Sequence, residues 1–176
     1  MSTSLILTIV GPDRPGLVNL LSDKVTAFGG NWLESRMANL AGQFAGIVHL
    51  HVPQARLEPL IAALGELERQ GLRVVATPGT DAAMGQPGRR LQLELIGQDR
   101  PGIVRDISHA LASRGVSIEE LVTDCVSGSM SGESLVTATA RLRVPAQLGT
   151  AQLRDALEAL ANDLMVDVTL DESDPR

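Results

Sequence analysis

An Asp-Arg pair occurs twice in the chain, each time between a glycine and a Pro-Gly dipeptide. Residues 11–16 have the sequence GPDRPG, and residues 97–102 have the sequence GQDRPG. Three kinds of chemistry suit such a segment. The aspartate could cap a following helix, the glycine-bordered N–H groups could bind an anion such as a carboxylate, or the Asp-Arg pair could serve acid-base catalysis.

Catalysis is the weakest of the three interpretations. An aspartate at a helix N-terminus is stabilised as the anion, which makes it a poor proton carrier near neutral pH. No Ser-His or Cys-His pair adjoins either segment, and no Lys-Ser or Lys-Thr pair follows Gly16, so a P-loop nucleotide site is excluded. We therefore predict no catalytic residues, and helix capping and anion binding both stay open.

The two segments belong to a longer internal repeat. Nine positions are identical when 11–37 is aligned with 97–123, and the second copy is longer around Ser127–Glu133. A fixed repeat of this length indicates two structural units of the same kind. The predicted organisation is a first domain at 1–78, a Gly/Pro-rich linker at 79–90, a second domain at 91–171 and a charged tail at 172–176.

Hydrophobic periodicity gives both copies the order β-α-β-β-α-β. In the first copy we expect strands at 4–10, 31–40, 44–52 and 72–77, with a helix opening at the GPDRPG turn and a second helix around 57–67. In the second copy we expect strands at 91–96, 117–126, 134–144 and 165–170, and helices at about 102–114 and 149–163. The predicted fold class is α+β, with two ferredoxin-like units in tandem and both helices of each unit on one face of its sheet.

Charge and composition narrow the classes of partner. The net charge is −6, all of it from residues 81–176, and aromatic residues make up only 2% of the chain. Nucleic-acid binding normally needs a basic face and, for single strands, stacking rings, so direct contact with nucleic acid is not expected. No apolar stretch approaches the roughly 20 residues of a membrane span. The absence of a signal peptide and the single cysteine predict a cytoplasmic protein.

A unit of about 80 residues with DRPG at its first strand–helix junction resembles the ACT domain. The stretch GGNWLESRMANLAGQFAGI, residues 29–47, is similar to the first ACT unit of glycine cleavage repressors. This resemblance implies a non-enzymatic regulator without a cofactor, which binds a small amino acid, glycine above others. It also implies action through a regulatory protein such as a transcription activator. Small units of this fold leave sheet edges to pair, so we expect a homodimer that forms through a sheet edge or a helix face.

The resemblance also implies which residues hold the effector. In ACT domains the amino acid lies where the first turn meets the start of the second strand, often at an interface between units. Asn31 makes the first copy the stronger candidate, because its repeat partner Ser117 offers less. The ligand-binding set implied in this way is Gly11, Asp13, Arg14, Pro15, Gly16, Asn31 and Trp32, with Gly97, Asp99, Arg100, Pro101, Gly102, Ser117 and Ile118 in the second copy.

Two alternatives of other kinds stay open. One is a small enzyme with its site between the two domains, and the other is an ACT interaction module that has lost ligand binding. Trp32 could equally cover a sheet face, and the longer segment at Ser127–Glu133 is best explained as a tolerated insertion.

Two further features receive structural interpretations. His49 and His51 share one strand face and could bind a metal, but their repeat partners are arginines, so we predict a solvated or interface strand and no metal site. We expect Cys125 to be a small buried hydrophobe.

Overall fold

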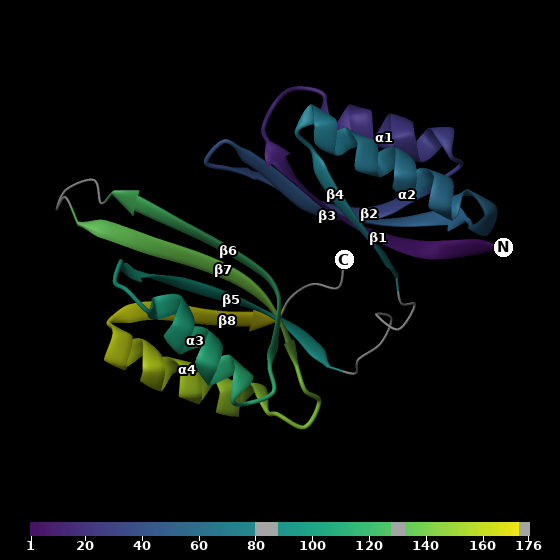
Figure 1. Ribbon diagram of the computed structural model, residues 1–176. Coiled ribbons are helices and arrows are strands. Elements are labelled where there is room, and N and C mark those ends of the chain that lie inside the picture. Colours follow the sequence, from purple (N-terminus) through teal and green to yellow (C-terminus); the bar gives the residue numbers. More distant parts are fainter. Residues whose placement is uncertain (80–87, 128–132, 173–176) are drawn as a thin grey trace. The chain divides into compact units, whose positions relative to one another are not determined.

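The computed structural model describes residues 1–79, 88–127 and 133–172. The chain divides into two compact units, Met1–Gly85 and Gln86–Arg176, called unit 1 and unit 2 below. Each unit has the order β-α-β-β-α-β (Figure 1). The predicted fold class is confirmed.

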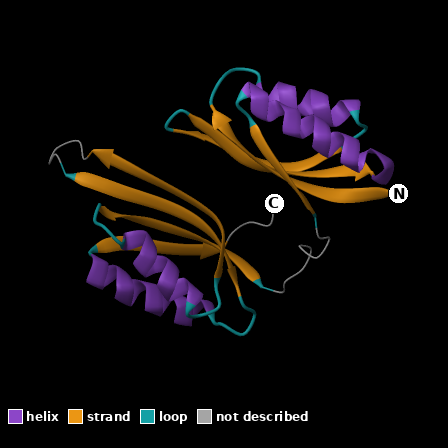
Figure 2. Ribbon diagram, in the orientation of Figure 1, coloured by secondary structure: helices purple, strands orange, loops and turns teal. Residues whose placement is uncertain are grey.

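Unit 1 is a four-stranded antiparallel sheet with the strand order β2-β3-β1-β4. Both of its α-helices lie on the same face of the sheet (Figure 2), and the other face carries no helix from the described part of this unit. Its elements are β1 (Ser2–Pro12), α1 (Leu17–Ala27), β2 (Asn31–Leu40), β3 (Gln43–Pro53), α2 (Leu57–Gly65) and β4 (Arg73–Pro78), with short 3₁₀ helices at Gln54–Arg56 and Glu66–Gln70 on either side of α2.

Unit 2 repeats this architecture with the strand order β6-β7-β5-β8. Its elements are β5 (Arg89–Gln98), α3 (Ile103–Ala112), β6 (Ser117–Ser127), β7 (Ser134–Val144), α4 (Thr150–Leu164) and β8 (Val166–Glu172). No helix in the described ranges has the length and hydropathy needed to cross a bilayer.

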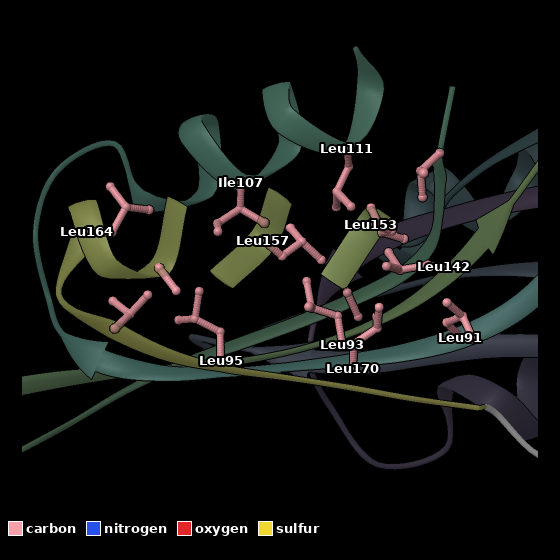
Figure 3. Close-up of a cluster of buried hydrophobic side chains, with 14 of the residues drawn as sticks. Leu91, Leu93, Leu95, Ile107, Leu111, Leu142, Leu153, Leu157, Leu164 and Leu170 are labelled. Atoms are coloured by element: carbon pink, nitrogen blue, oxygen red, sulfur yellow. The ribbon is translucent and has the colours of Figure 1, made fainter. Parts of the chain in front are cut away.

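Each unit has a hydrophobic core of its own between the sheet and its helices. Alternate residues of β1 from Leu5 to Ile9 point toward α1 and α2 and are almost completely buried. In unit 2, Leu93 of β5, Leu111 of α3 and Leu157 of α4 meet in the same way (Figure 3). Burial of a leucine side chain contributes about 1.5–3 kcal/mol, so these alternating patterns fix which face of each sheet the helices cover.

The element boundaries differ from the predicted ones at a few places. Strand β5 begins at Arg89, so Arg89 and Arg90 are strand residues rather than linker, and Glu172 ends β8 rather than opening a tail. Arg89 is held there because its guanidinium donates to the hydroxyl of Thr150, 2.7 Å away. Residues 80–87 of the predicted linker, 128–132 of the predicted insertion and 173–176 of the predicted tail lie outside the described residues.

The edge strands β2 and β6 share an irregularity. The register of β2 on β3 shifts between Trp32 and Glu34, and that of β6 on β7 shifts between Ile118 and Glu120. A single extra residue in one strand is a β-bulge, which bends and twists the strand locally. The repeat therefore preserves this detail as well as the order of the elements.

Candidate functional site at the second Asp-Arg turn

The two Asp-Arg segments form the same backbone turn before the first helix of each unit. Gly16 and Gly102 are the residues that precede α1 and α3, with φ of 88° and 94°. This left-handed conformation favours glycine. The helical hydrogen bonds begin there, because the carbonyl oxygen of Gly16 accepts from the N–H of Leu20 at 2.9 Å. The interpretation of Asp13 as a helix cap is wrong, since no side chain caps either helix and Pro15 lies before the first helical residue.

In the first turn the polar groups bind within unit 1. The N–H of Asp13 donates to the carbonyl of Gly42 at 2.9 Å, and its carboxylate accepts from the side-chain amide of Asn39. The guanidinium of Arg14 donates to the carbonyl of Gln70 at 3.0 Å. Both charged side chains of this turn thus have partners in the protein.

The second turn has the same backbone anchor and different side-chain partners. The N–H of Asp99 donates to the carbonyl of Ser134 at 2.9 Å, the counterpart of the Asp13–Gly42 bond. Within the described residues, the carboxylate of Asp99 has no hydrogen-bond partner. In the same described part of the chain, the Nε of Arg100 is buried without an acceptor. A buried donor without a partner is costly unless water or a ligand satisfies it.

A pocket of about 420 Å³ lies beside this second turn. Ligand sites for small molecules begin at roughly 300 Å³, so the pocket is at the small end of that range. Asp99 and Arg100 come from the turn, and the far end of β6 closes the opposite side. The lining residues are Asp99, Arg100, Gly102, Ile103, Val104, Arg105, Thr123, Asp124, Cys125 and Val136.

The side of β6 that faces the pocket follows from its register. Cys125 pairs with Val136, which is buried on the helix side of the sheet. Successive side chains of a strand point to opposite faces. Thr123 and Cys125 therefore present their side chains to the pocket, Asp124 contributes mainly backbone, and the free anionic group is that of Asp99.

Two arginines supply the positive charge of the pocket. The guanidinium of Arg105 lies 2.8 Å from the carboxylate of Asp106, and a nitrogen of Arg100 lies 3.9 Å from the same carboxylate. Asp106 is in the first turn of α3, where the helix dipole favours an anion. Asp106 thus holds both guanidinium groups at the edge of the pocket. Asp99 lines the same pocket, so positive and negative groups both border it.

The structure separates the two groups of residues that the resemblance placed in one site. Asn31 pairs with His51, which pairs with Ser4, near the start of β1. The first turn follows the other end of β1, where Gly11 pairs with Phe44. Because a strand is an extended chain, most of the length of β1 lies between Asn31 and the turn.

Unit 2 shows the same separation. Ser117 and Ile118 begin β6, whereas its far end adjoins the second turn. Within one unit, then, the turn meets the end of the second strand and not its start. The pocket also lies at the second copy, whereas Asn31 had favoured the first.

Arg105, Thr123 and Cys125 are pocket residues that the sequence did not identify. The strand pairing could have identified Thr123 and Cys125. Strand β7 pairs with both β5 and β6, so the end of β6 lies level with the end of β5 and with the turn that follows it. Cys125 is exposed, so the prediction of a buried residue is wrong. Its exposure follows from its place on the edge strand beside the pocket.

The remaining candidates take part in local structure. The Nε2 of His49 lies 2.8 Å from the hydroxyl of Ser4, and the rings of His49 and His51 meet edge to face at 5.7 Å. Across the part of the chain that the structure describes, no group of three or more His, Cys, Asp or Glu side chains is arranged for a metal ion. Trp32 is half-buried and packs against the core of unit 1.

Comparison with known proteins agrees with the fold. Residues 3–77 match the family model of the ACT domain. Unit 1 is an ACT domain. Unit 2 has the same topology, so the chain is a tandem of two units with the ACT fold. A search of curated protein sequences finds no significant match to the chain.

Two solved structures share the whole tandem fold. One is a protein of unknown function from Galdieria sulphuraria, with a TM-score of 0.84 and 26% identity, covering 99% of this chain and 100% of that one. The other is a protein provisionally named a glycine cleavage system transcriptional repressor, with a TM-score of 0.74 and 20% identity, covering 99% of each chain. The second likeness is one of fold.

Proposed function

We propose that this protein is a non-enzymatic, cytoplasmic regulator that binds a small amino acid in the pocket beside the second turn. An ACT domain in unit 1, the tandem fold and the chemistry of the pocket support this function. The regulator needs no cofactor. It acts through contact with a regulatory protein such as a transcription activator, by analogy with the name of the repressor-like structure.

The observation that carries the proposal is the pairing of opposite charges around one small pocket. A free amino acid has a carboxylate and an ammonium group a few ångströms apart. Arg100, with its unsatisfied buried Nε, and Arg105 suit the carboxylate, because arginine donates charge-assisted hydrogen bonds to such groups. Asp99 suits the ammonium group. A pocket of about 420 Å³ has room for a free amino acid, and the name of the repressor-like structure favours glycine by analogy.

Residues at the starts of the second strands enter this proposal in another way. Asn31, Trp32, Ser117 and Ile118 lie at the far end of their own sheets from the turns. They could reach a ligand at a turn only from another unit, which a second copy of the chain would supply. A homodimer is part of the proposed function for this reason and because each sheet has edge strands, which are open to pairing.

Calorimetric titration with a panel of amino acids tests the proposal. We expect glycine or a close analogue to bind, and Asp99→Asn to weaken binding by roughly tenfold or more, because one charge-assisted hydrogen bond is lost. Asp13→Asn is the matched control, since it makes the same change in the first turn. Glycolate, which has the carboxylate without the ammonium group, should bind weakly to wild type and equally to Asp99→Asn.

Failure of every amino acid to bind the wild-type chain would contradict the sensor function. The interaction module would then be the better hypothesis. Turnover of a metabolite by purified protein, lost on substitution of Asp99, would instead favour the enzyme.

A further inference from the structure

The two turns differ at one position of the neighbouring edge strand. Asn39 pairs with Phe44, which pairs with Gly11, and Cys125 pairs with Val136, which pairs with Gly97. Asn39 and Cys125 are thus structural equivalents at the ends of β2 and β6. The amide of Asn39 donates to the carboxylate of Asp13, whereas a cysteine thiol is only a weak donor.

We infer that Asn39 closes the first turn to ligands and that Cys125 leaves the second turn open, so that the chain binds one amino acid. This inference rests on the proposed function. It states that the residue at position 39 or 125 determines which of the two turns binds the amino acid. The carboxylate that would receive the ammonium group is already engaged in unit 1. In unit 2 the same carboxylate has no partner among the described residues.

Other differences between the copies act in the same direction. Arg14 is anchored to the carbonyl of Gln70, whereas Arg100 keeps a buried donor without an acceptor among the residues described. The position of Arg105 is occupied in unit 1 by Asn19, which removes the second cation. At the position of Val136 the first copy has Phe44, whose larger ring packs against the core of unit 1. Positive charge and free donors are therefore reduced at the first turn.

The test is to place the amide of the first copy into the second. Cys125→Asn should weaken binding of the amino acid found for the wild type by roughly tenfold or more, because the introduced amide would compete with the ammonium group for Asp99. Val126→Asn is the matched control, because this neighbouring side chain points to the opposite face of β6. Wild type should bind one ligand per chain.

Two binding results would overturn the inference while leaving the proposed function intact. One is equal binding by the Cys125→Asn and Val126→Asn variants. The other is binding of two ligands per wild-type chain, with one lost in Asp13→Asn. Failure of the wild type to bind any amino acid would instead contradict the proposed function.

A measurement without ligand tests the interaction between residue 39 and Asp13, and the one introduced between residue 125 and Asp99. In a double-mutant cycle of Asp13→Ala and Asn39→Ala, thermal unfolding midpoints should be non-additive by about 2–4 °C, the size of a modest hydrogen bond in a unit of this length. Cys125→Asn should likewise raise the midpoint only when Asp99 is present. Additive shifts in both cycles would overturn the inference whether or not a ligand is known.

Discussion

The carboxylate of Asp13 accepts a hydrogen bond from Asn39, whereas the carboxylate of Asp99 has no such partner within the described residues and lies beside an exposed cysteine. The two aspartates have the same neighbours in sequence and the same backbone anchor. Their difference arises from residues 26 positions further along the chain. A motif of four residues therefore cannot by itself tell a binding turn from a structural one.

Cys125 is the only cysteine of the chain, so its alkylation reports on the pocket directly. We expect a saturating amino acid ligand to slow the reaction of Cys125 with iodoacetamide several-fold, because the ligand would cover the thiol. Mass spectrometry of the labelled protein at successive times gives the rate. A Cys125→Ser, Ser113→Cys variant moves the thiol to the other end of α3 and should show no protection. Equal rates with and without ligand at Cys125 would place the ligand elsewhere.

The backbone conformation at position 16 requires glycine, whereas the space around this position does not. The φ of Gly16 is 88°, and no atom lies within 4 Å of an added Cβ. Gly16→Ala should destabilise unit 1 by about 1 kcal/mol, the left-handed penalty less the entropy lost from the unfolded chain. Gly65→Ala is the control, because Gly65 is equally open but has helical torsions. Chemical denaturation measures both, and an equal effect of the two substitutions would contradict this explanation.

At the scale of elements, the alternating and helical patterns were enough to predict the strands and α-helices of the described residues to within a few positions. The cap of α1 was assigned wrongly because Asp13 and Pro15 suit the first positions of a helix. In the structure, Asp13 instead forms hydrogen bonds with Gly42 and Asn39. Such partners come from distant strands, and local preferences do not contain them.

The placement of Asn31 could have been obtained from the element order. Strand β1 runs to the turn, and α1 then carries the chain back along the face of the sheet. The next strand must therefore begin at the opposite end of the sheet from the turn. What could not be predicted is the pocket, because it depends on which side chains at the end of β6 leave space.

Strand β6 is the element that we expect to mediate self-association. It is an edge strand, and Leu121 and Val122 are 43% and 60% exposed. Val122→Lys should shift the proposed homodimer toward monomer, because an outward lysine on an edge opposes strand pairing. Light scattering coupled to size-exclusion chromatography measures the mass. Ile96→Lys is the control, because it places the same charge on the same face of the sheet but on the inner strand β5. An equal effect of this control would indicate association through the sheet face.

At the scale of the whole molecule, charge decides the class of partner. The surplus of six acidic groups and the scarcity of aromatic rings oppose contact with a polyanion. We therefore propose that any regulation of transcription by this chain passes through an intermediary protein. The amino acid would then alter the affinity of this protein for the intermediary, and by linkage the intermediary would alter the affinity for the amino acid.

We expect no direct binding to duplex DNA. Fluorescence anisotropy of a labelled duplex at low ionic strength should show no saturable rise up to roughly 10⁻⁴ M protein, where even non-specific DNA-binding proteins associate. Addition of the amino acid ligand should leave this result unchanged. A saturable rise that disappears with added salt would show a phosphate-binding surface and contradict action through an intermediary.

The bulges at the same place in β2 and β6 have a consequence for solubility. A long, flat edge strand is a template on which further chains can add without limit, as in amyloid fibres. A bulge interrupts the regular spacing of the free N–H and C=O groups and twists the strand near its start. The edges formed by β2 and β6 can thus accept a short partner strand but cannot extend pairing along their whole length, which favours closed pairs over growing filaments.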